Sequence, residues 1–169
     1  MIIKKLLKSF RDALRGIIFC LYNERNMRIH TMAVVYVLFL SLFFGLSRAE
    51  YAILFVTIAL VVTAEMINTS IEVLTDIGAP QYNSASRVAK DVAAGGVLVT
   101  AIMAVVVALC LFTRADGFVR LYAYFTGAVY RIPVLIVSIF ASMVFVFVGP
   151  ADIKNKITRI IKGKRRKKD

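Results

Sequence analysis

Four long apolar segments limit the possible folds of this chain more than any other feature of its sequence. They occupy residues 31–47, 51–72, 93–112 and 132–148. Each is close to the roughly 20 residues that a helix needs to cross a hydrocarbon core of about 30 Å. The whole chain is 60% hydrophobic, whereas soluble domains are about half apolar. The sequence therefore predicts an all-α integral membrane protein with three core spans and a fourth.

The distribution of basic residues predicts how these segments cross the membrane. Of the 22 Lys and Arg residues, seven precede Thr31, two lie between the second and third spans, and nine follow Pro150. Four spans with both termini in the cytoplasm place these 18 residues inside, where short loops usually collect Lys and Arg. A three-span arrangement would put the nine basic residues of the tail outside. We therefore expect four spans with both termini cytoplasmic.

The segments between and beyond the spans have distinct patterns. Residues 1–30 predict an amphipathic helix in the membrane interface, because apolar and basic residues recur there on opposite helix faces. Residues 113–131 predict an external connector, and residues 149–169 a basic cytoplasmic tail. The net charge of +12 could indicate a nucleic-acid partner. In a membrane protein, however, such a tail is better explained as a topology signal that rests on anionic lipid, so we expect no nucleic-acid partner.

One face of the second predicted span carries several polar side chains. At about 100° per residue, Asn68, Glu72 and Asp76 lie within about 60° of Glu65 around the helix. At about 1.5 Å per residue, Glu65 lies about 21 Å from Tyr51, inside the apolar layer, and Glu72 lies about 31 Å away, at the cytoplasmic edge. A carboxylate at membrane depth costs at least about 2.5–3.5 kcal/mol. A hydrogen bond between helices would need only one such residue, so the shared face indicates a functional site.

Two further polar clusters are expected at the same depth. Lys90 and Asp91 begin the third span, and the segment 23–28 ends the interfacial helix. Either cluster alone is more often a solvated helix end than a site. The sequence contains no Walker phosphate loop and no protein-kinase signature. A nucleotide would therefore be held by carboxylates, a metal ion and lysine.

These residues together resemble the prokaryotic diacylglycerol kinase and undecaprenol kinase family, which consists of small trimeric membrane enzymes that phosphorylate lipid alcohols. The resemblance covers Lys4 to about Phe112. It rests on three motifs in order: Asn23-Glu24, then Glu65-X-X-Asn68-Thr69-X-X-Glu72-X-X-X-Asp76, then Lys90-Asp91-X-Ala93-Ala94-Gly95. Residues 131–169 extend beyond this core, so we expect their removal to leave measurable activity.

The resemblance implies a role for each matched residue. It implies that Glu65 is the general base and that Glu24 and Glu72 hold Mg²⁺ against the phosphates of ATP. Asn68 and Asp76 are implied to support the site. The implied contacts with the nucleotide form a larger set: Glu24, Glu72, Gln81, Tyr82, Asn83, Lys90 and Asp91.

The resemblance also implies a cofactor, substrates and an assembly. These are Mg²⁺, ATP as co-substrate, a membrane lipid alcohol as acceptor, and a homotrimer with sites between subunits in the bacterial cytoplasmic membrane. Residues 24–30 resemble the Gram-positive branch of the family, which favours undecaprenol; diacylglycerol is the alternative. An ion or proton carrier using Glu65 and Glu72 is a further alternative. We disfavour it because the ionisable residues gather at one membrane edge and do not cross the bilayer.

Overall fold

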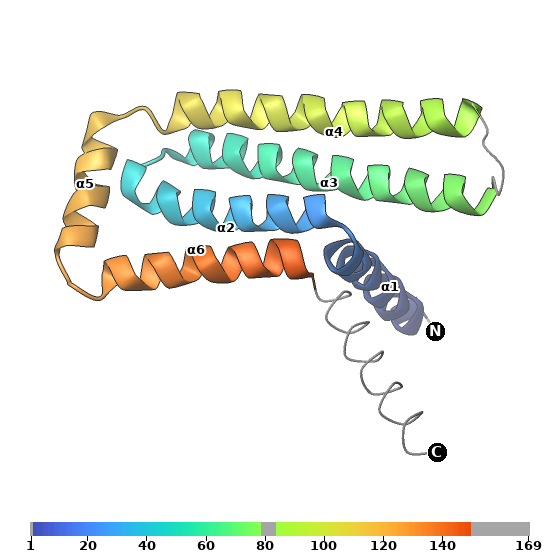
Figure 1. The fold of residues 1–169 in the computed structure, drawn as a ribbon, viewed down its shortest axis with the longest axis horizontal. Helices are drawn as coiled ribbons and strands as arrows, with labels where there is room; N and C mark the ends of the chain where they lie inside the picture. The colour runs from blue at the N-terminus through green and yellow to red at the C-terminus, as the bar shows by residue number, and fades with distance from the viewer. Residues whose placement is uncertain (1, 79–83, 150–169) are drawn as a thin grey trace, which may run out of the picture.

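The computed structural model describes residues 2–78 and 84–149, and in these residues it contains six helices and no strand. The helices are α1 (Ile2–Asn23), α2 (Arg25–Phe44), α3 (Arg48–Gly78), α4 (Ser84–Leu111), α5 (Ala115–Thr126) and α6 (Arg131–Val148) (Figure 1). Four of them, α2, α3, α4 and α6, are long and apolar enough to cross a membrane. The predicted all-α fold with four membrane-spanning helices is therefore confirmed.

Helix α2 connects the fourth span to the rest of the fold. In Figure 1 the four long helices run side by side in the order α6, α2, α3, α4, with α1 and α5 at opposite ends of this layer. Helices α3 and α4 have the most extensive contact, while α2 packs against α3 on one side and α6 on the other. Helix α6, which lies beyond the predicted core, thus folds back onto α2.

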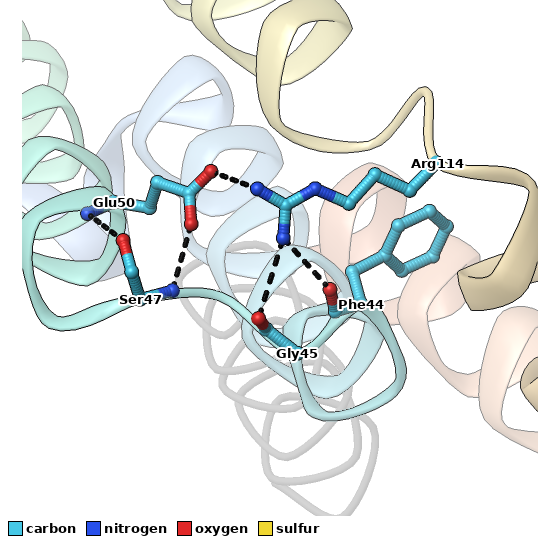
Figure 2. Close-up of polar contacts among 5 residues, drawn as sticks. All are labelled: Phe44, Gly45, Ser47, Glu50 and Arg114. Carbon is cyan, nitrogen blue, oxygen red and sulfur yellow. Dashed lines mark hydrogen bonds and ion pairs between the residues drawn. The ribbon is translucent and has the colours of Figure 1, made fainter.

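The turn between α2 and α3 is fixed by local hydrogen bonds (Figure 2). Gly45 ends α2 with φ of 57°, a left-handed conformation that glycine adopts readily. The Ser47 N–H donates to Glu50 Oε2 (2.7 Å) and the Glu50 N–H donates to Ser47 Oγ (3.3 Å), which forms a capping box. Arg114 pairs with Glu50 and donates to the carbonyl oxygens of Phe44 (3.4 Å) and Gly45 (3.3 Å). Arg114 therefore ties this turn to the start of α5.

Helix α5 covers the hydrophobic core at the same end of the layer. Phe44 is completely buried there, and its ring meets those of Phe112 and Phe118 edge-on, with centroids 5.2 and 5.1 Å away. A Cβ atom at Gly117 would lie 2.4 Å from the Phe44 ring, so only glycine allows α5 this close approach. The sequence pattern predicts only an external connector over residues 113–131, whereas the structure contains the helix α5 there.

The cytoplasmic location of both termini remains a prediction, and it can be tested by labelling. We would introduce Asp116→Cys or Asp169→Cys singly into a variant that lacks Cys20 and Cys110. A membrane-impermeant maleimide added to intact cells should label the cysteine at 116, in α5, and leave the one at 169 unlabelled. Permeabilised cells should show labelling of both. Labelling at 169 from outside would contradict the four-span orientation.

Candidate active site

The candidate site begins at the corner between α1 and α2. The sequence pattern predicts one interfacial helix over residues 1–30, but the structure ends α1 at Asn23 and begins α2 at Arg25. Glu24 forms the corner, with an extended backbone conformation (φ −99°, ψ 122°). Its N–H donates to the Cys20 carbonyl oxygen (2.8 Å), whereas its side chain makes no capping hydrogen bond to α2. The carboxylate is therefore free to act away from its own helix.

Helix α3 contributes the polar face that its sequence predicts. Glu65, Asn68 and Thr69 are 1%, 6% and 2% exposed, and Glu72 is partly buried. Asn68 Nδ2 donates to Glu72 Oε1 (2.9 Å), and Thr69 Oγ1 donates to the Glu65 carbonyl oxygen (3.0 Å). The Cys20 thiol of α1 lies within hydrogen-bonding reach of the Thr69 side chain. Helix α1 thus packs directly onto the polar face of α3.

Three carboxylates converge where α1, α2 and α3 meet. Glu24, Glu65 and Glu72 lie close enough for their negative charges to repel one another. Burial raises the pKa of the Glu24 carboxyl group, repulsion from Glu72 raises it further, and nearby Arg28 lowers it. The Asn26 side chain lies within hydrogen-bonding reach of the Glu65 carboxyl group. This concentration of negative charge makes the corner a suitable place for a cation.

The side chains at this corner fit Mg²⁺ held together with phosphate oxygens. Magnesium takes oxygen ligands and usually combines one or two carboxylates with phosphate groups and water. Glu24 and Glu72 offer two carboxylates from different helices. Glu65 Oε2 and Asn68 Oδ1 are buried acceptors without a hydrogen-bond partner in the part of the chain that the structure describes. In those same residues, no three His, Cys, Asp or Glu side chains could hold a metal by themselves, so further ligands would come from nucleotide and water.

The other predicted site residues are placed differently. Lys90 of α4 forms an ion pair with Asp76 of α3 and so joins the ends of these two helices. The Asp91 side chain is 73% exposed and pairs with Arg87 of the same helix (3.9 Å), outside the group of three carboxylates. Three predicted nucleotide contacts lie outside the described residues: Gln81, Tyr82 and Asn83.

Two side chains near the carboxylates were given no role from the sequence. Asn26 reaches Glu65, and Arg28 is only 4% exposed beside Glu24. A signal for Arg28 was available, because residues four apart lie on the same side of a helix and Arg28 follows Glu24 at this spacing. No spacing rule links Asn26 to Glu65, since this contact joins two different helices.

An apolar cavity of about 100 Å³ lies between the helices and reaches Val61 of α3, one helical turn from Glu65. Residues of α2, α3 and α4 line it, including His30, Val61 and Ala104. Val61 precedes Glu65 by four residues and therefore lies one turn away on the same face of α3. The cavity extends toward the Arg48 end of α3, which is the deeper direction in the predicted membrane.

Comparisons with known proteins give one consistent result. Residues 11–112 match the prokaryotic diacylglycerol kinase family. The chain is 40% identical over 107 residues to a diacylglycerol kinase of Synechocystis sp., a match that covers 63% of this chain and 61% of that protein. It is 34% identical over 110 residues to an undecaprenol kinase of Bacillus subtilis, covering 65% of this chain and 89% of that protein. The chain thus spans less than two thirds of the first relative and most of the second.

Proposed function

The chain belongs to the prokaryotic diacylglycerol kinase family, and we propose that it transfers the γ-phosphoryl group of ATP to the hydroxyl group of a membrane lipid. The observation that carries this proposal is the convergence of Glu24, Glu65 and Glu72 at the corner of three helices. Phosphoryl transfer depends mainly on positioning and charge neutralisation, which such a group of carboxylates can provide through a metal ion.

Glu65 is the proposed general base. It is almost completely buried, its Oε2 is an unpaired acceptor among the described residues, and the apolar cavity begins one turn away. A lipid hydroxyl group presented from this cavity would reach Glu65 before it reached water. As the lipid oxygen forms its bond to the γ-phosphorus and the bond to the leaving ADP oxygen breaks, Glu65 accepts the hydroxyl proton. The Asn26 side chain lies within hydrogen-bonding reach of the Glu65 carboxylate, and the Thr69 hydroxyl group donates to the Glu65 carbonyl oxygen within α3.

Glu24 and Glu72 are the proposed residues that hold Mg-ATP. A bound Mg²⁺ would neutralise part of the negative charge of the phosphate groups. Asn68 fixes Glu72 through its 2.9 Å hydrogen bond, so that this carboxylate keeps one orientation. Glu65 and Glu72 are seven residues apart on α3, or about 10 Å. This separation leaves room for a phosphate group at the water boundary and a lipid hydroxyl group slightly deeper.

The proposal extends to the remaining nucleotide contacts and to the assembly. Lys90 pairs with Asp76 from the second turn of α4, where its positive charge suits a phosphate group. Asp91 and the segment 81–83 complete the proposed contacts with ATP. We place the enzyme in the bacterial cytoplasmic membrane as a homotrimer with sites between subunits, an arrangement that rests on the family resemblance.

Undecaprenol is the proposed acceptor, and a substrate panel tests this choice. Purified protein in mixed micelles would receive γ-labelled ATP, Mg²⁺ and matched amounts of several lipid alcohols, with a lipid-free sample to measure ATP hydrolysis. We expect the highest specificity constant for undecaprenol, because residues 24–30 resemble the Gram-positive branch. Equal or higher values for diacylglycerol would contradict the substrate choice. Failure to phosphorylate any lipid alcohol would contradict the kinase function.

A further inference from the structure

Arg28 of α2 is a buried charge that connects the fourth span to the candidate site. It is only 4% exposed. Its Nε donates to the carbonyl oxygen of Val146 in the last turn of α6 (3.2 Å), and its Nη1 donates to the carbonyl oxygen of Tyr22 at the end of α1 (3.0 Å). The last carbonyl groups of a helix lack partners within the helix and carry partial negative charge. The partial negative charges at these two helix ends therefore compensate the positive charge of the buried guanidinium group.

Gly149 brings the end of α6 into direct contact with Arg28. It follows the last residue of α6, is buried and has φ of 53°, a conformation that other residues rarely adopt. A Cβ atom at this position would lie 2.9 Å from Arg28 Nη2 and 3.0 Å from its Cζ. Any larger residue at 149 would therefore push the guanidinium group away from its place. Glycine allows α6 to approach Arg28 this closely.

Arg28 also fixes the corner that carries Glu24, one turn earlier in the chain. Its bond to the Tyr22 carbonyl oxygen (3.0 Å) reaches the end of α1 two residues before Glu24, while Arg28 itself belongs to the first turn of α2. The guanidinium group therefore joins the two helices on either side of Glu24. A shift of Arg28 would change how these helices meet and hence where the Glu24 side chain lies.

We infer that α6 is a positioning element of the site: its last turn holds Arg28, and Arg28 fixes the corner between α1 and α2 from which Glu24 reaches Mg-ATP. The role rests on the proposed function of Glu24. Helix α6 lies beyond residues 11–112, so this contact is made by a part of the chain that the family match does not include. Arg28 is a positioning residue, because it acts on the nucleotide through Glu24. Loss of the contact should weaken Mg-ATP binding and leave the chemical step largely intact.

The substitution Gly149→Ala tests this inference directly. The added Cβ should displace the Arg28 guanidinium group from Val146, and we expect the Kd and KM for Mg-ATP to rise about tenfold, as for loss of one charge-assisted hydrogen bond. The kcat should change by less than about twofold, since the base is untouched. Binding would be measured without lipid substrate, and the temperature of unfolding would be recorded for each variant. Arg28→Gln should have the same effects as Gly149→Ala.

Two control variants separate the loss of Mg-ATP affinity from a general loss of stability. Gly16→Ala makes the same substitution at an exposed position of α1 with no atom within 4 Å of the new Cβ, and it should bind Mg-ATP like the wild type. Tyr36→Phe removes the 2.8 Å hydrogen bond between Tyr36 and Ser142, which joins α2 to α6 away from the site. It should lower the unfolding temperature slightly and leave Mg-ATP binding unchanged.

The combined variant decides whether α6 acts through Arg28. If it does, adding Gly149→Ala to Arg28→Gln should not raise the Kd for Mg-ATP further, although the strained backbone at position 149 should still lower the unfolding temperature. Additive effects on the Kd, or normal Mg-ATP binding by Gly149→Ala, would overturn the positioning role and leave the proposed kinase function standing. A wild-type protein that binds no Mg-ATP would instead overturn the proposed function itself, and the positioning role with it.

Discussion

Replacing Glu65 by glutamine is expected to lower lipid turnover by about 10²–10⁴-fold while Mg-ATP binding stays close to that of the wild type. Glutamine keeps the size of the side chain and can still hydrogen-bond, but it cannot take the proton of a lipid hydroxyl group. Glu65 lies deeper than Glu72 on α3, one helical turn from Val61, which lines the apolar cavity. The substitution should therefore remove the base and leave the phosphate contacts in place.

Lipid turnover and Mg-ATP binding would both be measured on the same purified preparation of each variant. Glu50→Gln is a matched control, because it makes the same change on α3 at the far end, where Glu50 pairs with Arg114 (Figure 2). It should retain nearly full turnover. If Glu65→Gln abolished Mg-ATP binding while Glu72→Gln left it intact, the two assigned roles would be reversed. If Glu65→Gln kept full turnover, the base would have to be another group.

Features that depend on local periodicity could be predicted from the sequence. The four spans follow from segment length and hydropathy, which are properties of single helices. The buried face of α3 follows from the helical repeat, which places Glu65, Asn68 and Glu72 on one side whatever packs against them. The pair between Asp91 and Arg87 is equally local, with a spacing of four residues.

Features that depend on contacts between distant segments could not be predicted. The break at Glu24 carries no glycine or proline signal, and α1 packs there against both α2 and α3. Arg28 bonds to the backbone carbonyl oxygen of Val146, which any residue could provide, so no side-chain pattern reveals the contact. The same holds for α5, where close packing of Gly117 on Phe44 fixes the helix against the core.

Replacing either Glu24 or Glu72 by glutamine is expected to weaken Mg-ATP binding itself, by about 10–100-fold. Each substitution removes one of the two carboxylates that a hard cation would use, and excess Mg²⁺ should partly restore binding because the remaining ligands are intact. Asp12→Asn is the matched control. It removes a negative charge from α1 at an exposed pair with Arg15 and should leave the Kd for Mg-ATP unchanged.

Glu24→Gln and Glu72→Gln should differ in how their Mg-ATP binding responds to pH. Burial first, and Glu72 second, raise the pKa of Glu24, so protons compete with Mg²⁺ at a higher pH than they would at an exposed glutamate. Wild-type affinity for Mg-ATP should therefore fall as the pH is lowered through this raised pKa, whereas Glu24→Gln should lose that part of the dependence. Glu72→Gln removes the repulsion between the carboxylates, so the fall should begin at lower pH. Identical pH profiles for the wild type and Glu24→Gln would exclude Glu24 as a ligand for Mg-ATP.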